Sequence, residues 1–153
     1  EKKILSPEMS GEKSLASSTQ PSKSTAQKIR VLLVDDHVMV RQGLRTLLDT
    51  YPDIKLVGEA ANGEEAVRRV KQRRPEVVVM DINMPGINGI EATKQIKLHY
   101  PDTVIIGISV NAARENQEAM MRAGAVQLLT KEAAIGELHD AILLAMKTRG
   151  MTR

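Results

Sequence analysis

Residues 31–37 read Val31-Leu32-Leu33-Val34-Asp35-Asp36-His37, an apolar run that ends in two adjacent carboxylates. A run this short and this apolar predicts a strand that is buried on both faces of a parallel sheet. Three later runs, at 77–80, 104–108 and 126–129, follow the same plan and lead to Asp81, Ser109 and Lys131. Ligands of an open α/β sheet lie outside the carboxyl ends of its strands. We therefore expect three carboxylates, a hydroxyl and an ammonium group to converge on one crevice.

The segments between these runs predict helices that stop at prolines. Pro52, Pro75 and Pro101 each stand between a polar-faced segment and an apolar run, and proline ends a helix at or before the preceding residue. The predicted strands are 29–34, 55–60, 77–81, 104–109 and 126–129, and the predicted helices are 38–50, 62–73, 89–99, 113–123 and 134–147. Apolar stripes mark the first helix at Val40, Leu44, Leu47 and Leu48, and the last at Ile135, Leu138, Ile142, Ala145 and Met146.

This alternation of strands and helices predicts an α/β fold. Five successive units imply right-handed crossovers and a doubly wound parallel sheet of five strands. Segment 55–60 is the most polar of the strands, so we expect it at an edge. The first and third strands would then meet at the topological switch point, where a ligand is expected.

Composition indicates one folded domain at 29–148, preceded by a flexible linker or tail at 1–28 and followed by a tail at 149–153. The chain has 153 residues, no Cys and no apolar stretch near the ~20 residues of a membrane span. We therefore expect a cytoplasmic domain without disulfides and without membrane insertion. The first 28 residues supply +2 of the formal charge of +3. The basic cluster at 68–74 predicts a solvated helix face, so we expect no direct nucleic acid contact.

Four motifs, taken together, resemble the receiver (CheY-like) domain of two-component response regulators. They are residues 31–37, residues 79–89 (Val-Met-Asp-Ile-Asn-Met-Pro-Gly-Ile-Asn-Gly), the strand ending in Ser109, and Ala123-Gly124-Ala125 leading to Lys131. The resemblance covers about residues 29–148 and implies a flavodoxin-like (βα)5 fold with strand order 2-1-3-4-5. The Asp-Asp-His triplet and Lys131-Glu132 are similar to the branch that often carries a helix-turn-helix output domain.

A magnesium site is the first expectation for the acidic residues. Mg²⁺ suits one or two carboxylates together with phosphate oxygens and water. The resemblance implies direct contact by Asp36 and Asp81, contact by Asp35 mainly through water, and contact by the Asn83 carbonyl. Taken alone, Asp35 and Asp36 are equally well explained as caps of the following helix.

The remaining residues predict phosphoryl chemistry. An aspartate carboxylate can accept a phosphoryl group as an acyl phosphate, which makes Asp81 the candidate nucleophile. Lys131 would act as a point charge on the phosphate, and the resemblance makes Ser109 the switch hydroxyl. Alone, Asp81 and Ser109 are typical turn or cap residues, and Lys131 is a typical solvated lysine. Leu128 stands where many receivers have an aromatic residue, so output through the face of 113–123, 126–129 and 134–147 would depend on Ser109 and repacking.

The resemblance and the predicted site residues imply a phosphoacceptor that takes a phosphoryl group from a histidine kinase or phosphotransfer protein. No independent substrate turnover is expected beyond self-phosphorylation from a donor and autodephosphorylation, and a homodimer through the same face is a further expectation. The leader favours the receiver of a hybrid sensor histidine kinase tethered to a membrane sensor, and a truncated DNA-binding response regulator is the alternative parent. Alternatives from other classes are a Mg-dependent aspartyl-nucleophile phosphohydrolase and an unphosphorylated interaction module. His37, His99 and His139 are predicted to be surface or cap residues and not metal ligands.

Overall fold

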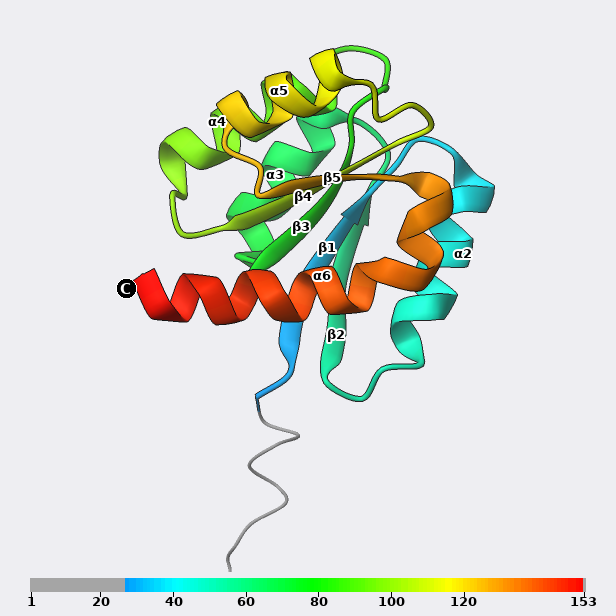
Figure 1. Cartoon of the computed structure of the whole chain (residues 1–153), viewed down its shortest axis with the longest axis vertical. Helices are drawn as coiled ribbons and strands as arrows, with labels where there is room; N and C mark the ends of the chain where they lie inside the picture. Colours follow the sequence, from blue (N-terminus) through cyan, green and yellow to red (C-terminus); the bar gives the residue numbers. More distant parts are fainter. Residues whose placement is uncertain (1–26, 153) are drawn as a thin grey trace, which may run out of the picture.

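The computed structural model describes residues 27–152, so nearly all of the predicted leader lies outside the described residues. The chain alternates strands and helices throughout (Figure 1). In chain order they are β1 (Ile29–Val34), α2 (Val38–Asp49), β2 (Ile54–Ala60), α3 (Gly63–Arg73), β3 (Val77–Asp81), α4 (Gly89–His99), β4 (Val104–Ser109), α5 (Arg114–Ala123), β5 (Gln127–Thr130) and α6 (Lys131–Thr152).

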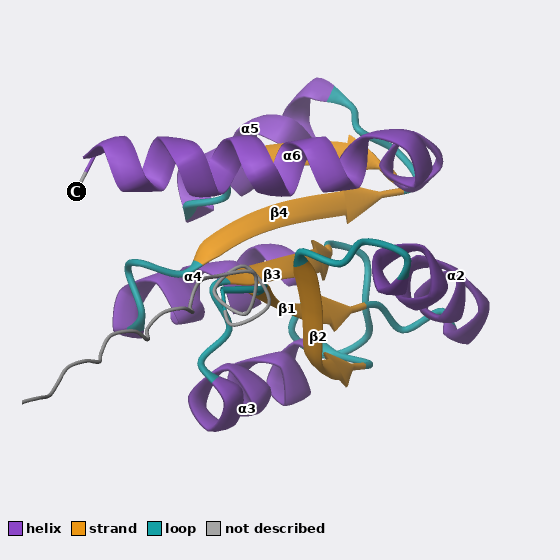
Figure 2. Ribbon diagram, turned by 90° about the horizontal axis from the view of Figure 1, so that it is seen from below, coloured by secondary structure: helices purple, strands orange, loops and turns teal. Residues whose placement is uncertain are grey.

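The five strands form one sheet in the order β2-β1-β3-β4-β5, and every neighbouring pair is parallel. The predicted fold class, strand order and edge position of β2 are confirmed. Figure 2 shows the arrowheads of β1, β3 and β4 at the same end of the sheet. β1 and β3 are neighbours although α2, β2 and α3 separate them in the chain. The carboxyl ends of these two central strands therefore lie side by side.

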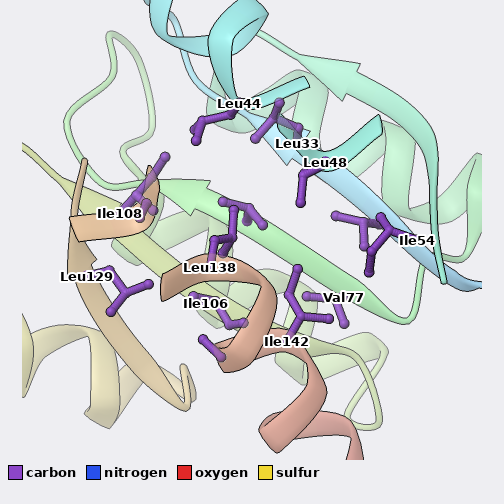
Figure 3. Close-up of a cluster of buried hydrophobic side chains, with 14 of the residues drawn as sticks. Leu33, Leu44, Leu48, Ile54, Val77, Ile106, Ile108, Leu129, Leu138 and Ile142 are labelled. Carbon is purple, nitrogen blue, oxygen red and sulfur yellow. The ribbon is translucent and has the colours of Figure 1, made fainter. Parts of the chain in front are cut away.

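Side chains alternate between two cores, one on each face of the sheet. Leu33, Val79 and Ile106 point into a core covered by α2 and α6, whereas their neighbours Leu32, Val78 and Ile105 point into a core that includes residues of α3, α4 and α5. Figure 3 shows the first core, with Leu44 and Leu48 of α2 and Leu138 and Ile142 of α6 around the strand side chains. Burial on both faces explains why these strands are continuously apolar.

Local signals end and begin the helices close to the predicted positions. The Asn62 side chain accepts a hydrogen bond from the Glu65 N–H at the start of α3, and Asn88 does the same for Glu91 in α4. Gly124 follows α5 with a φ of 116°, a left-handed conformation that favours glycine. The asparagine caps therefore fix where α3 and α4 begin, and Gly124 fixes where the chain leaves α5 to enter the next strand.

The last strand and helix differ from the prediction. β5 covers 127–130 instead of 126–129, and α6 covers 131–152 instead of 134–147, so residues 149–152 continue the helix that was expected to give way to a tail. Thr130 Oγ1 accepts a hydrogen bond from the Ala133 N–H and so caps a helix that begins directly after the strand. The buried stripe of α6 runs through Ala134, Leu138, Ala141 and Ile142, and Ile135 is 63% exposed.

Among the helices of residues 27–152, none has the length and apolar character needed to cross a bilayer.

Candidate functional site

The site forms at the carboxyl ends of the central strands. Asp35 and Asp36 directly follow β1, and Asp81 is the last residue of β3. Because Val34 is paired with Met80 in the parallel register, Asp35 and Asp81 stand next to each other. Lys131 enters from the other side as the first residue of α6. The predicted convergence of carboxylates and ammonium is thus present in the structure.

Lys131 joins two fully buried carboxylates. Its Nζ lies 2.9 Å from Asp35 Oδ2 and 3.2 Å from Asp81 Oδ2, and the lysine side chain is only 10% exposed. Two anionic groups therefore share one cation in a region that water barely reaches. Close carboxylates with too little compensating charge repel each other.

This environment changes the acidity of Asp81. Burial is the main cause that raises the pKa of its carboxyl group, and the charge of Asp35 raises it further. The hydrogen bond from the Asn83 N–H, at 3.1 Å from Oδ1, and the nearby Lys131 lower it only in part. The pKa of Asp81 therefore rises from 3.8 to about 6. Burial acts to lower the pKa of Lys131, but its contacts with Asp35 and Asp81 outweigh burial and raise that pKa.

One carboxylate oxygen in the site, Asp36 Oδ1, is buried without a hydrogen-bond partner. Asp35 Oδ2 is paired with the Lys131 ammonium at 2.9 Å. Buried polar atoms are nearly always satisfied in native proteins, so the Asp36 oxygen calls for a ligand. Asp35, Asp36 and Asp81 together form an oxygen-rich set of the kind that Mg²⁺ prefers. The residues present therefore fit a magnesium ion.

The loop after β3 is held tightly beneath Asp81. In the segment Met84-Pro85-Gly86, Gly86 has a φ of 75°, a left-handed conformation that favours glycine. A Cβ on Gly89 would lie 2.2 Å from the carbonyl oxygen of Asp81, so only glycine allows α4 to begin this close to the strand end. Asn83 is exposed at the start of this loop.

Ser109 reaches the same end of the sheet but is engaged elsewhere. It is fully buried, and it follows Ile108, the partner of Asp81 in the register. Its hydroxyl donates to the Asn111 carbonyl at 2.8 Å and accepts from the Asn111 N–H at 3.1 Å. The hydroxyl thus binds the loop between β4 and α5 in this structure.

His37 is a site residue that the sequence reasoning missed. It is the residue before α2, but its side chain makes no capping hydrogen bond. Instead its Nδ1 lies 3.2 Å from Asp35 Oδ1, 3.2 Å from Asp36 Oδ1 and 3.1 Å from Lys131 Nζ. The available signal was its place in the same turn as the two aspartates. His139 lies far from this group, where it bonds to Asp53 and stacks on Tyr51.

Comparison with known proteins agrees with this geometry. Residues 31–143 match the family model of the response regulator receiver domain. The chain is 44% identical over 119 residues to the transcriptional regulatory protein LiaR of Bacillus subtilis, covering 78% of this chain and 56% of LiaR. It is 45% identical over 114 residues to the response regulator UvrY of Escherichia coli, covering 74% and 52%. The chain therefore spans about half the length of the curated relatives it matches.

A solved structure gives the same result for the fold. The response regulator domain of Thermotoga maritima CheB superimposes with a TM-score of 0.73 at 37% identity, covering 78% of this chain and 97% of that one. The chain belongs to the receiver domain family of two-component response regulators. Membership in this family favours signal transduction over the phosphohydrolase alternative.

Proposed function

We propose that this domain accepts a phosphoryl group on Asp81 from a phosphohistidine of a histidine kinase or phosphotransfer protein. The observation that carries the proposal is the buried group of Asp81, Asp35 and Lys131 at the strand ends, with Asp36 beside it. The same charged side chains would be common on a solvent-exposed surface. Full burial of two repelling carboxylates is costly unless cations compensate them.

Asp81 is the nucleophile in this proposal. A carboxylate oxygen of Asp81 attacks the phosphorus, an O–P bond forms, and the N–P bond of the donor breaks with its electron pair returning to the imidazole. Lys131, already 3.2 Å from Asp81 Oδ2, is placed to neutralise the oxygens of the transferred group. Catalysis of such a transfer consists mostly of positioning and charge compensation. Attack of water on the same phosphorus later restores the carboxylate and releases phosphate.

A magnesium ion completes the proposed site. Asp36 and Asp81 would hold it directly, Asp35 mainly through water, and the Asn83 carbonyl would add a further oxygen. When bound, the ion supplies positive charge to the phosphoryl oxygens. The buried Asp36 oxygen without a hydrogen-bond partner supports this assignment.

The phosphodonor needs a surface beside the site. An apolar groove of about 680 Å³ lies between α2 and the first turns of α6, and Lys131 forms part of its wall. Met39 and Ile135 are 79% and 63% exposed there. Exposed apolar side chains of this kind mark protein interaction sites. We assign this groove to the partner that carries the phosphohistidine.

A second surface is proposed for output. Met121 of α5, Val126 before β5 and Leu144 of α6 are exposed apolar side chains on or beside the three elements predicted to form the output face. We assign this face to a homodimer that forms on phosphorylation, with Ser109 as the switch hydroxyl. Leu128 packs under it in the core and offers no ring to rotate.

The parent protein is proposed to be a transcription regulator. LiaR, matched over about half of its length, is a transcriptional regulatory protein. This match favours a DNA-binding parent over the hybrid sensor kinase that the leader suggested. The coding sequence on both sides of residues 1–153 tests the choice, because a kinase core upstream would overturn it.

Phosphorylation is tested by incubation with acetyl phosphate and Mg²⁺, followed by intact-mass measurement. We expect one added phosphoryl group on the parent chain and none on Asp81→Ala. Asp140→Ala, which changes an exposed carboxylate on α6, is the matched control and should be labelled as the parent is. Equal labelling of Asp81→Ala would refute the assignment of the nucleophile.

Metal binding is tested by a Mg²⁺ titration followed by amide chemical shifts. We expect weak binding, because a water-rich magnesium site uses few protein ligands. Asp36→Ala should weaken binding more than Asp35→Ala, since Asp36 is assigned direct contact. Identical titrations of the parent and Asp36→Ala would count against the proposed ligand set.

A further inference from the structure

His37 places an imidazole nitrogen among the carboxylates of the site. Its Nδ1 and one oxygen from each of Asp35, Asp36 and Asp81 all lie within 4.8 Å of one another. The His37 N–H also donates to Asp35 Oδ1 at 2.8 Å, which fixes the turn that carries the ring. The position of the imidazole is therefore set by the same turn that presents the acidic residues.

The contacts of Nδ1 conflict with one another. Lys131 Nζ, at 3.1 Å, can only donate a hydrogen bond to this nitrogen. The carboxylate oxygens of Asp35 and Asp36, both at 3.2 Å, can only accept one from it. No single arrangement of the imidazole proton satisfies both kinds of neighbour.

A metal ion removes this conflict. In an octahedral site with bonds of about 2.1 Å, adjacent ligand atoms lie about 3.0 Å apart and opposite atoms about 4.2 Å apart. Nδ1 is 3.2 Å from Asp36 Oδ1 and 4.0 Å from Asp81 Oδ2, the two carboxylates assigned to direct contact. Independently of these distances, Asp36 Oδ1 is a buried atom without a hydrogen-bond partner.

We propose that His37 is a fourth protein ligand in this site and makes it selective for first-row transition-metal cations such as Ni²⁺ over Mg²⁺. Imidazole suits Ni²⁺, Co²⁺ and Zn²⁺, whereas magnesium prefers oxygen ligands. His37 then coordinates Ni²⁺ and leaves Mg²⁺ binding unchanged. The inference rests on the proposed metal site but adds a ligand and a class of cation to it.

Binding of Ni²⁺ at this site also requires the Lys131 side chain to take a second position. Its ammonium group occupies the space between Asp35, Asp81 and His37 in this structure. A divalent cation held by His37 and the aspartates repels the ammonium at this distance. Lys131 therefore moves away from Asp35 when Ni²⁺ binds.

The test compares Ni²⁺ and Mg²⁺ binding to the parent chain, His37→Gln and His99→Gln, all without an affinity tag. His99 is a matched control because its Nδ1 contacts only the Gln95 carbonyl among the interactions found in residues 27–152. Isothermal titration calorimetry measures Ni²⁺, and amide chemical shifts measure Mg²⁺. We expect His37→Gln to lose at least about tenfold in Ni²⁺ affinity, the smallest loss usual for removing even an outer partner of a metal site. Mg²⁺ affinity should stay the same.

A second readout locates the ion. Substoichiometric paramagnetic Ni²⁺ should broaden the ring proton signals of His37 before those of His99 and His139. Unchanged Ni²⁺ affinity in His37→Gln, with Mg²⁺ still bound, overturns the inference and leaves the proposed function standing. Equal loss of both cations also overturns it, because His37 would then act on the structure of the turn. Failure of the parent chain to bind either cation would refute the proposed metal site itself.

Discussion

At the scale of single residues, the site has more carboxylate groups than ammonium groups to compensate them. Asp35 and Asp81 are buried together, and Lys131 is the one ammonium group within 4 Å of both among the described residues. This arrangement makes the metal-free fold less stable than a neutral site would. It also makes that stability depend on pH.

The pH dependence can be predicted from Asp81. Its pKa is raised from 3.8 to about 6 because of burial and the charge of Asp35. Between these two pH values the folded protein keeps a proton that the unfolded chain has lost, so the free energy of unfolding falls as the pH rises. The loss should be roughly 1–3 kcal/mol by pH 7. Urea unfolding in the presence of a chelator, followed by circular dichroism, measures it.

Asp81→Asn provides the control for this prediction. The amide carries no charge at any of these pH values, so the variant should be more stable than the parent at pH 7.5. Its stability should also change less between pH 4 and pH 6. Parallel pH profiles for the two chains would show that Asp81 is not the group responsible.

Most site residues could be predicted from the sequence because each follows an apolar run. Asp81 and Lys131 lie fifty residues apart in the chain, yet the rule for strand ends brings them together. His37 could not be predicted in the same way. Its role depends on the direction of a side chain at the start of α2, and the spacing of histidines along the chain carries no information on that direction.

At the scale of elements, the hydroxyl of Ser109 links β4 to the loop before α5. Both of its hydrogen bonds go to the backbone of Asn111. If Ser109 turns toward a phosphoryl group on Asp81, it must release Asn111. The loop at 110–113 then keeps only its other hydrogen bonds, among them those donated by Asn116 and Gln117 of α5, so we expect it to become more mobile.

Ser109→Ala should separate phosphorylation from this movement. The variant keeps Asp81, Lys131 and the acidic ligands, so beryllofluoride with Mg²⁺ should still bind. Amide shifts over residues 110–140 should then change much less than in the parent. Ser109→Thr, which retains the hydroxyl, should preserve the response, and a full response in Ser109→Ala would assign the switch to another residue.

The ends of elements were less predictable than the elements themselves. Helices with a proline stop or an asparagine cap begin and end within a residue or so of the prediction. The sequence prediction starts α6 three residues late because it assigns Lys131 to the end of a strand. The cap by Thr130 allows this lysine to be the first residue of the helix as well.

At the scale of the whole molecule, the sheet divides the interior into two separate cores. The edge position of β2 was predictable because β2 is the most polar strand, whereas the full order 2-1-3-4-5 was implied by the resemblance to receiver domains. The separation of the cores has a consequence for stability. Changes on opposite faces of the sheet should not influence each other.

Two pairs of substitutions test this independence. Ile96→Val on α4 and Ile142→Val on α6 lie in different cores, and each should cost about 0.5–1.5 kcal/mol of unfolding free energy. Their effects should add within about 0.5 kcal/mol. Met120→Ala and Leu128→Ala are the contrasting pair, because both side chains lie within 3 Å of the Cβ position of Gly107. Their effects should not add, and coupling across the sheet as large as within this pair would refute the separation.

The direct junction between β5 and α6 has a mechanical consequence. Thr130 is the last residue of the strand and Lys131 is the first residue of the helix, so no loop residue lies between the two elements. Thr130 is also held by its pairing with Ser109 and by the hydrogen bond from Ala133. A shift of Lys131 is therefore passed directly to the first turns of α6. Figure 1 shows these turns at an angle to the rest of the helix, so we expect the shift to change this angle before it reaches the far end of α6.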